Sequence, residues 1–187
     1  MKYDILQTAL KALRNGKTLL YPTDTIWGIG CDATNAQAVE QIYAIKKRDH
    51  SKSMLILVNE QMLSDNLSQE VWGLLRAERP TTVILPVEQV TIPIADNLPA
   101  SNHTVGVRIP QFDFCQQLLA QFGRPIVSTS ANFSGHPSPS GYHNIADDLK
   151  SRISCCLPDD DTFHHPDIKS SRIVKLSPSG ETIIIRD

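Results

Sequence analysis

The sequence predicts one α/β domain in which helices pack on a twisted, mixed sheet of parallel and antiparallel strands. Its 187 residues are the usual length of a single hydrophobic core. Helical and strand patterns alternate in the first half of the chain, whereas several later strands are separated by turns alone. The later pattern favours a mixed sheet over a strictly parallel one. No internal repeat or disordered stretch divides residues 1–187.

The first half of the chain supplies the alternating elements. Apolar residues recur at helical spacing from Leu6 to Leu13, and Gly16 follows as a typical C-cap residue. Thr34 and Asn35 precede the next helical pattern, and either is a suitable N-cap. The expected elements are helices over 4–15, 36–47 and, more weakly, 69–77, and strands over 18–21, 54–58 and 82–85.

The second half is richer in strands and loops. Residues 104–109 alternate toward a strand that ends at Pro110, and a helical face runs from Phe112 to Phe122. The apolar residues 125–127 lead into residues 128–141, whose serines and prolines are typical of a loop. The remaining expected elements are a short helix over 144–150 and strands near 153–157, 171–176 and 181–185.

Composition and charge exclude several classes of protein. With 18 Lys and Arg against 20 Asp and Glu, the net charge is −2, which excludes an acidic disordered tail and a uniformly basic histone-like protein. The N-terminus lacks a secretory signal, and no segment approaches the roughly 18 apolar residues of a membrane helix. The four cysteines show neither Cys-x-x-Cys nor zinc-finger spacing. We therefore expect a reduced, soluble protein of the cytoplasm without a membrane partner.

The first stretch that could carry chemistry is 21–32, where a strand runs into hydroxyls, a carboxylate and glycines. Such a turn offers hydrogen-bond donors and close backbone approach to a ligand, or it is a tight turn capped by Asp24. Gly28 and Gly30 form only half of a dinucleotide fingerprint, and the phosphate-loop motif is absent. The Trp27 side chain has two possible places: it lines a ligand pocket, or it packs in the hydrophobic core.

The second stretch, residues 46–53, concentrates cations at a helix end directly before a buried strand. A solvated helix end is the simpler interpretation, because the helix dipole favours cations there. The functional interpretation is a polyphosphate clamp, since Lys supplies a mobile charge and Arg a planar fork that suits phosphate oxygens.

The third stretch is 125–138, in which an apolar strand is followed by residues with small hydroxyl and amide side chains. These side chains can surround phosphates or a base with donors. Neither the G-x-S-x-G elbow nor the S-x-x-K pair of serine acylases is present. We therefore assign the serines to binding and not to covalent catalysis.

Together these stretches resemble the YrdC-like family of threonylcarbamoyl-AMP synthases. The family pattern combines a P-T-[DE]-T-x-[YW]-G-[LI]-G turn, a K-x-R helix end and an S-x-N loop, followed by shorter blocks in the closing strands. The matching segments, in chain order, are 22–30, 46–48, 104–110, 130–132, 171–174 and 185–186. The resemblance implies a YrdC-like fold with a concave basic ligand cleft, of the short type without a C-terminal extension domain.

The resemblance also implies a reaction. L-Threonine, bicarbonate or CO2, and ATP with Mg²⁺ would give threonylcarbamoyl-adenylate and pyrophosphate, for the threonylcarbamoyladenosine modification of tRNA position 37 by downstream transfer proteins. Lys46 and Arg48 would be catalytic. The residues implied to hold L-threonine are Thr25, Arg108 and Ser171. Those implied to hold ATP are Arg48, Lys52, Thr104, Ser128, Ser130, Asn132, Ser138 and Arg186.

Three positions depart from the family pattern, namely Ser53, Arg79 and Arg172. Arg79 replaces a glycine, which affects the expected shape of that loop, and Arg172 lies beside the implied threonine ligand Ser171. The Mg²⁺ ligands are not identified by the sequence. Residues 159–161 and 164–165, which are aspartates and histidines, are interpreted as polar turns and loops, although one of the aspartates is a candidate to help hold Mg²⁺.

Two other functions compete with the synthase hypothesis. The first is a binding module for double-stranded RNA or tRNA without catalysis, for which residues 46–52 form a local basic patch. The net charge of −2 weakens that hypothesis as a sole function. The second is a carbamoyl-transfer domain of the hydrogenase-maturation type, whose acylphosphatase and zinc-finger regions have no counterpart in 187 residues with four cysteines.

Overall fold

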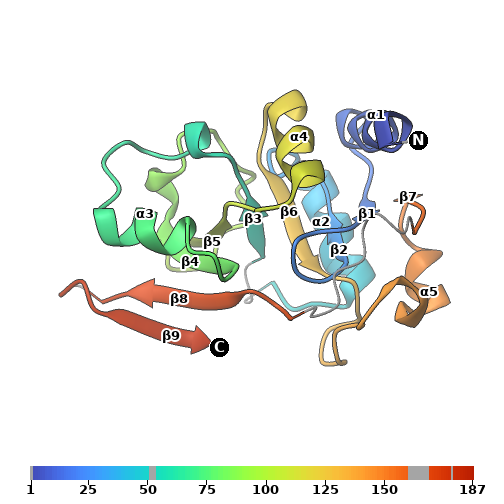
Figure 1. Cartoon of the computed structure of the whole chain (residues 1–187). Helices are drawn as coiled ribbons and strands as arrows, with labels where there is room; N and C mark the ends of the chain where they lie inside the picture. Colours follow the sequence, from blue (N-terminus) through green and yellow to red (C-terminus); the bar gives the residue numbers. More distant parts are fainter. Residues whose placement is uncertain (1, 51–53, 160–168, 178) are drawn as a thin grey trace.

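A mixed sheet organises the part of the chain that the computed structural model describes, residues 2–50, 54–159, 169–177 and 179–187. Nine strands of these residues lie in the order β7-β1-β2-β6-β3-β5-β4-β8-β9 (Figure 1). Three neighbouring pairs, β1–β7, β3–β5 and β4–β8, are parallel, and the other five are antiparallel. The expected mixed sheet is confirmed. The strands are β1 (Leu19–Tyr21), β2 (Gly28–Gly30), β3 (Leu55–Leu57), β4 (Thr81–Pro86), β5 (Thr104–Arg108), β6 (Ile126–Ser130), β7 (Cys155–Cys156), β8 (Arg172–Leu176) and β9 (Thr182–Arg186).

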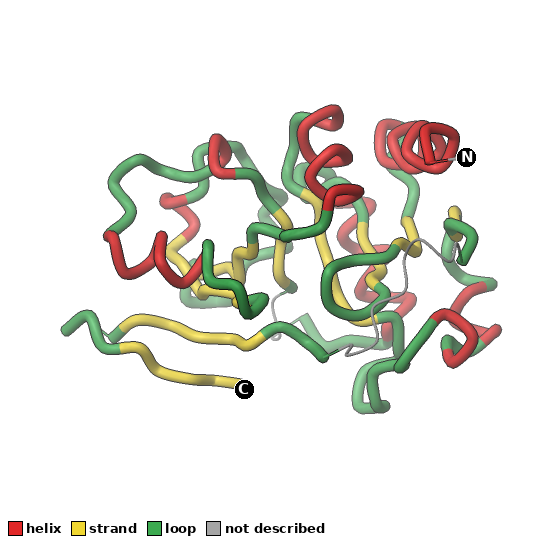
Figure 2. Tube along the Cα trace, in the orientation of Figure 1, coloured by secondary structure: helices red, strands yellow, loops and turns green. Residues whose placement is uncertain are grey.

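The helices cover the sheet where the apolar periodicity predicted them. Figures 1 and 2 show α1 and α4 on the same side of the molecule, and the hairpin of β8 and β9 along the opposite edge of the view. The helices are α1 (Lys2–Arg14), α2 (Ala36–Lys46), α3 (Gln69–Leu75), α4 (Asp113–Phe122) and α5 (Asp147–Lys150), with short 3-10 helices at Glu60–Met62, Val87–Gln89 and Tyr142–Asn144. Within the described residues, no helix is long and apolar enough to cross a membrane.

Alternation along the strands divides the core into two layers. Leu19 faces a cluster that contains the apolar sides of α1 and α4, while its neighbour Leu20 faces a second cluster that contains α2 and α3. Ile56 and Leu57 of β3 divide in the same way. Both faces of the central strands are thus covered by apolar clusters. This explains why the sequences of these strands are continuously apolar and do not alternate.

Strand β2 is the main element that the sequence did not predict. We expected Gly28 and Gly30 in a turn, but they pair with Tyr21 and Leu19 of β1 in an antiparallel ladder. A Cβ atom on Gly30 would lie 2.1 Å from the carbonyl oxygen of Val127 in β6. Glycine is therefore required for β2 and β6 to approach each other.

Strand β6 extends further than its apolar residues indicate. Ser128 to Ser130, which were expected to begin a loop, pair with β3 on one side and β2 on the other. Pairing with two neighbours satisfies the backbone of these polar residues and overrides their turn-like composition. The hydroxyls of the expected loop are thereby fixed on a central strand.

The caps of α2 resolve an alternative that the sequence left open. The Asn35 side chain accepts hydrogen bonds from the backbone N–H groups of Gln37 and Ala38, so Asn35 is the N-cap. At the other end Lys47 adopts a left-handed conformation with φ of 49°, and its backbone N–H donates to Ala44. This left-handed C-cap ends the helix directly before Arg48.

Candidate functional site

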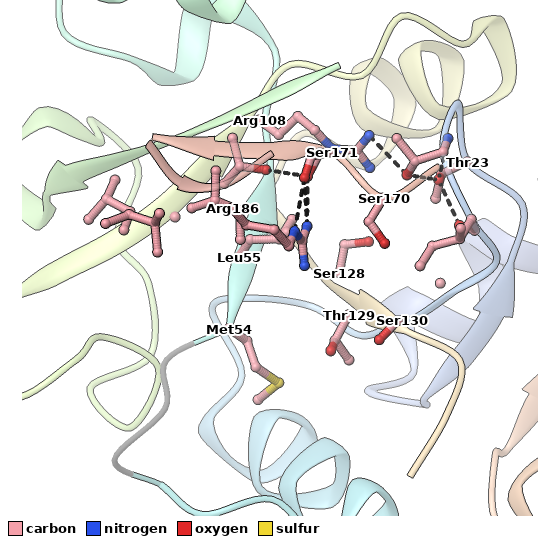
Figure 3. Close-up of a pocket in the computed structure, with 18 of the residues that line it drawn as sticks. Thr23, Met54, Leu55, Arg108, Ser128, Thr129, Ser130, Ser170, Ser171 and Arg186 are labelled. Carbon is pink, nitrogen blue, oxygen red and sulfur yellow. Dashed lines mark hydrogen bonds between the residues drawn. The ribbon is translucent and has the colours of Figure 1, made fainter. Parts of the chain in front are cut away.

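A pocket of about 380 Å³ lies where several strand ends and loops converge (Figure 3). It is lined by the turn after β1, by Arg48 after α2, and by residues of β2 to β6, β8 and β9. Among the implied site residues, those that line it are Thr25, Arg48, Arg108, Ser128, Ser130, Ser171 and Arg186. Residues from almost the whole length of the chain therefore meet in one cavity of a size typical for small ligands.

Arg108 at the end of β5 is held by a buried ion pair. Its Nη1 donates to Asp24 Oδ1 at 2.7 Å and to Thr25 Oγ1 at 3.2 Å, and the side chains of Arg108 and Asp24 are only 3% and 8% exposed. The second Asp24 oxygen accepts from the backbone N–H of Gln111 at 3.0 Å. The Arg108 Nε is buried without a partner among the described residues. The guanidinium therefore keeps unused donors while one edge is fixed.

Thr23 and Thr25 extend this network along the turn. Thr23 Oγ1 lies 2.8 Å from the carbonyl oxygen of Ile26 and 2.9 Å from Thr25 Oγ1, and it accepts from the Thr25 backbone N–H at 3.1 Å. Both threonines are buried and line the pocket. Thr23 belongs to the matched segment 22–30, but the sequence does not assign it a role, since its hydroxyl fits an ordinary turn equally well.

Ser171 and Arg186 form a second polar group that faces the pocket. Arg186 donates from Nε and Nη2 to the Ser171 carbonyl oxygen at 3.2 and 2.7 Å, and Ser171 Oγ lies 2.8 Å from Thr82 Oγ1. Burial and the nearby charge of Arg108 lower the pKa of Arg186. Within the described residues no acidic side chain pairs with Arg186, so an anionic ligand would relieve the repulsion between the two guanidiniums.

An irregularity in the β8–β9 pairing shapes this side of the pocket. The register shifts between Ile173 and Val174, which leaves Ile185 beside Arg186 without a regular partner. Both Ile185 and Arg186 line the pocket, whereas neighbours in a regular strand point to opposite faces. Sequence alternation could not reveal this bulge.

Arg48 and the serines of β6 line another part of the cavity. Arg48 is half-buried, and burial lowers the pKa of its guanidinium. Ser128 is buried and Ser130 half-buried at the end of β6. These groups supply the positive charge and the hydroxyl donors that phosphate oxygens need.

Lys46 has a different position from the one expected of a phosphate clamp. It is 1% exposed and does not line the pocket, and its Nζ donates to the backbone carbonyl oxygens of Ser130 and Asn132 at 2.5 and 2.7 Å. Burial, and to a smaller extent the charge of Arg48, lowers the pKa of Lys46 to about 7. Lys46 thus links the end of α2 to the chain segment after β6.

Asn132 completes this link without reaching the cavity. Its Nδ2 donates to the carbonyl oxygens of Phe133 and His136 at 3.1 and 2.5 Å, so the amide closes the turn that follows β6. The backbone N–H of Ser134 donates to the carbonyl oxygen of Lys46. The K-x-R and S-x-N motifs are therefore joined through backbone groups.

Three other implied ligands of ATP lie away from the pocket or outside the structure. Thr104 begins β5, and its hydroxyl donates to Asn102 Oδ1 at 2.7 Å, outside the lining of the pocket. Ser138 is exposed in the loop after β6. Lys52, like the departure at Ser53, lies outside the described residues.

The structure also shows where Trp27, Arg79 and Arg172 lie. Trp27 is 5% exposed and satisfies both interpretations, because it lines the pocket and packs in the core with its ring 4.8 Å from that of Tyr142. Arg79 pairs with Asp187 at the surface. Arg172 lies half-buried beside Ser171, which still faces the pocket. Residues 160–161 and 164–165 lie outside the described residues.

Among the residues that the structure describes, those around the pocket do not form a metal site of their own. No Asp or Glu is among the lining residues, and the described ranges contain no group of three or more His, Cys, Asp or Glu side chains that could hold a metal. Mg²⁺ prefers carboxylate oxygens and substrate phosphates. The donor set fits a metal that arrives on a phosphate ligand better than a resident ion.

Comparison with known proteins gives a consistent result. A family model that carries the names Sua5, YciO and YrdC, and the description telomere recombination, matches residues 11–187. The threonylcarbamoyl-AMP synthase of Photobacterium profundum is 31% identical over 164 residues, which cover 82% of this chain and 86% of that relative. The synthase of Pyrococcus abyssi is 29% identical and covers 84% of this chain, which spans only 47% of that longer relative.

Solved structures show the same fold. The crystal structure of P. abyssi Sua5 complexed with L-threonine superposes with a TM-score of 0.83 at 26% identity, over 100% of this chain and 54% of that one. Escherichia coli YciO superposes with a TM-score of 0.77 over 100% of this chain and 90% of that one, and its 22% identity supports the fold alone.

Proposed function

Because the chain belongs to the Sua5/YciO/YrdC family, we propose that it is an L-threonylcarbamoyladenylate synthase. In this reaction the amine of L-threonine adds to CO2 or bicarbonate, and an oxygen of the resulting carbamate attacks the α-phosphorus of ATP. The products are threonylcarbamoyl-AMP and pyrophosphate. The enzyme is thus a nucleotidyltransferase that transfers an adenylyl group to a carbamate.

The convergence of two kinds of group in one pocket carries this proposal. Arg108, Thr25 and Ser171 supply a guanidinium and hydroxyls suited to an α-amino acid, and Arg48, Ser128 and Ser130 supply donors suited to phosphates. Arg186 lines the same pocket and donates to the carbonyl oxygen of Ser171. A pocket with this composition fits a reaction that joins a small carboxylic acid derivative to a nucleotide.

The residues act mainly by alignment and charge neutralisation. The attack on phosphorus spreads negative charge over the phosphate oxygens while pyrophosphate leaves, and the Arg48 and Arg186 guanidiniums stabilise that charge. Arg108 binds the threonine carboxylate through the donors that Asp24 leaves unused. Held in this way, the carbamate and the α-phosphate react as neighbours, which is itself a large part of such catalysis. No side-chain nucleophile is required.

We propose that Mg²⁺ enters with ATP. The lining residues within the described ranges offer hydroxyls and cations but no carboxylate, so the metal would be bound by the phosphates and water and would neutralise charge on them. Lys46 contributes indirectly, because it holds the backbone that follows Ser130.

We also propose that the product serves the modification of adenosine 37 in tRNA, with separate transfer proteins as partners. A reaction that uses ATP and serves tRNA is expected in the cytoplasm. Binding of double-stranded RNA by the segment 46–52 is the weaker alternative, because Lys46 is buried and contributes no surface charge. Arg48 faces the pocket.

The decisive experiment is pyrophosphate release from ATP with Mg²⁺ and bicarbonate, with and without L-threonine. Release that requires L-threonine supports the proposal, and mass spectrometry should detect threonylcarbamoyl-AMP. Arg48→Ala should raise the KM for ATP, and Arg108→Ala the KM for L-threonine, while circular dichroism confirms the fold. Turnover without L-threonine would contradict the proposed reaction.

A further inference from the structure

The hydroxyl network of the turn after β1 has a fixed direction. Thr23 Oγ1 has one proton, and the Ile26 carbonyl oxygen at 2.8 Å can only accept it. Thr23 Oγ1 therefore accepts from both of its other partners, the Thr25 backbone N–H and the Thr25 hydroxyl. With one proton donated and two lone pairs occupied, the Thr23 hydroxyl has no capacity left.

This direction determines what Thr25 can offer to a ligand. The Thr25 hydroxyl proton is committed to Thr23, and one of its lone pairs accepts from Arg108 Nη1 at 3.2 Å. One lone pair remains, on a buried side chain that lines the pocket. A ligand group that meets Thr25 Oγ1 must therefore be a hydrogen-bond donor, since an acceptor there would face the remaining lone pair and find no proton.

We propose that Thr23 is a positioning residue that makes Thr25 an obligate acceptor for the side-chain hydroxyl of the amino-acid substrate. This inference rests on the proposed function. Arg108 next to Thr25 binds the carboxylate, so the groups within reach of Thr25 are the amine and the hydroxyl. The amine is the reacting nitrogen and must face CO2 and the phosphate donors Arg48 and Ser130. The hydroxyl takes no part in the chemistry and is the donor left for Thr25.

The arrangement of the pocket agrees with this assignment. Figure 3 shows Thr23 and Arg108 on one side of the cavity, and Thr129 and Ser130 on another. A threonine whose carboxylate meets Arg108 can then present its hydroxyl to the turn and its amine to the cavity. Thr23 itself does not need to touch the substrate, because its hydroxyl is saturated.

The test compares two ligands that differ only in the hydroxyl. Calorimetry measures the Kd of L-threonine and of L-2-aminobutyrate for the wild type, Thr23→Ser and Thr23→Val. In Thr23→Val the Thr25 proton is free to rotate, so the preference for L-threonine should weaken. The Kd of L-2-aminobutyrate divided by the Kd of L-threonine should fall by about 3- to 10-fold, the effect of one neutral hydrogen bond. Thr23→Ser keeps every hydrogen bond and should keep the wild-type ratio. If Thr23→Val does not fold, Thr23→Ala gives the same comparison.

The outcomes separate the proposed position of Thr23 from a structural effect and from the proposed function. An equal weakening of both ligands in Thr23→Val overturns the inference, because it indicates a loosened turn or a contact with the amine. An unchanged ratio, together with threonine-dependent pyrophosphate release by the wild type, rejects the inference and leaves the proposed function standing. Failure of L-threonine to bind or to stimulate release in the wild type rejects both.

Discussion

Arg108 and Asp24 form an ion pair of 2.7 Å in which both side chains are almost completely buried. Asp24 does not line the pocket, and its second oxygen is occupied by the Gln111 backbone. Asp24 therefore acts on a ligand only through Arg108, as the counter-charge that fixes the orientation of the guanidinium.

We predict that Asp24→Ala raises the KM for L-threonine by tenfold or more and leaves the KM for ATP close to that of the wild type. An unpaired buried guanidinium costs about 3–5 kcal/mol, part of which appears as lower stability. Asp32→Ala is the matched control, because Asp32 is an equally buried carboxylate that pairs with Arg124 instead. Steady-state kinetics with each substrate varied check the prediction, and an unchanged threonine KM in a folded Asp24→Ala variant would contradict it.

Arg186→Lys should raise the KM of both substrates by about tenfold. The guanidinium uses two N–H groups on one carbonyl oxygen of Ser171 while it faces the pocket, and an ammonium cannot reproduce that planar fork. Arg79→Lys, which alters only the surface pair with Asp187, serves as the control and should behave as the wild type. Wild-type KM values in Arg186→Lys would show that the contact with Ser171 is dispensable.

The stability of the protein should depend on pH through Lys46. Burial lowers its folded pKa to about 7, below about 10.4 in the unfolded chain. Between these values the unfolded state holds a proton that the folded state lacks, so the free energy of unfolding rises with pH by up to about 1.4 kcal/mol per unit. Below pH 7 Lys46 is protonated in both states. The folded state then bears the full cost of burying the ammonium charge, and stability no longer changes with pH through Lys46.

Denaturant titrations of the wild type and Lys46→Met across pH 6–10 test this dependence. The difference in unfolding free energy between them should change between pH 7 and 10 and stay constant at lower pH. Lys11→Met, which removes an exposed lysine of α1, is the control. A difference that does not vary with pH would mean that the Lys46 ammonium stays protonated throughout the range.

Gly30→Ala should destabilise the protein by about 3 kcal/mol or more, because the new methyl group would collide with the Val127 carbonyl oxygen and force β2 from β6. Gly73→Ala in α3 is the contrasting variant, since open space surrounds its Cβ position. Alanine favours a helix, so this change should stabilise by up to about 1 kcal/mol. Thermal unfolding of both variants provides the comparison.

Much of the fold could be predicted because its helices and long strands have strong periodicity. The site positions of Arg108 and Arg48 come from the resemblance to the YrdC-like family, because a strand end and a helix end alone fit ordinary surface charges equally well. Strand β2 could not be predicted, because three residues with two glycines carry no strand propensity and pair only in the context of β1 and β6.

The orientation of individual site residues depends on contacts that are distant in the sequence. Lys46 looks like an exposed cation beside Arg48, but the fold buries it, and it donates to the carbonyl groups of Ser130 and Asn132. Asp24 looks like the cap of its own turn, but in the folded chain it pairs with Arg108, which lies 84 residues away in the sequence. Such partners are set by the tertiary structure, and local patterns do not encode them.

The strand order has a consequence for how the protein becomes competent to bind. β4 in the middle of the chain pairs with β8 near its end, and the cavity needs Thr23 from the beginning as well as Arg186. Loop closure over such separations is slow, so folding is expected to be limited by these late pairings. Ligand binding would then report completion of the whole sheet, since no partly assembled intermediate contains every wall of the cavity.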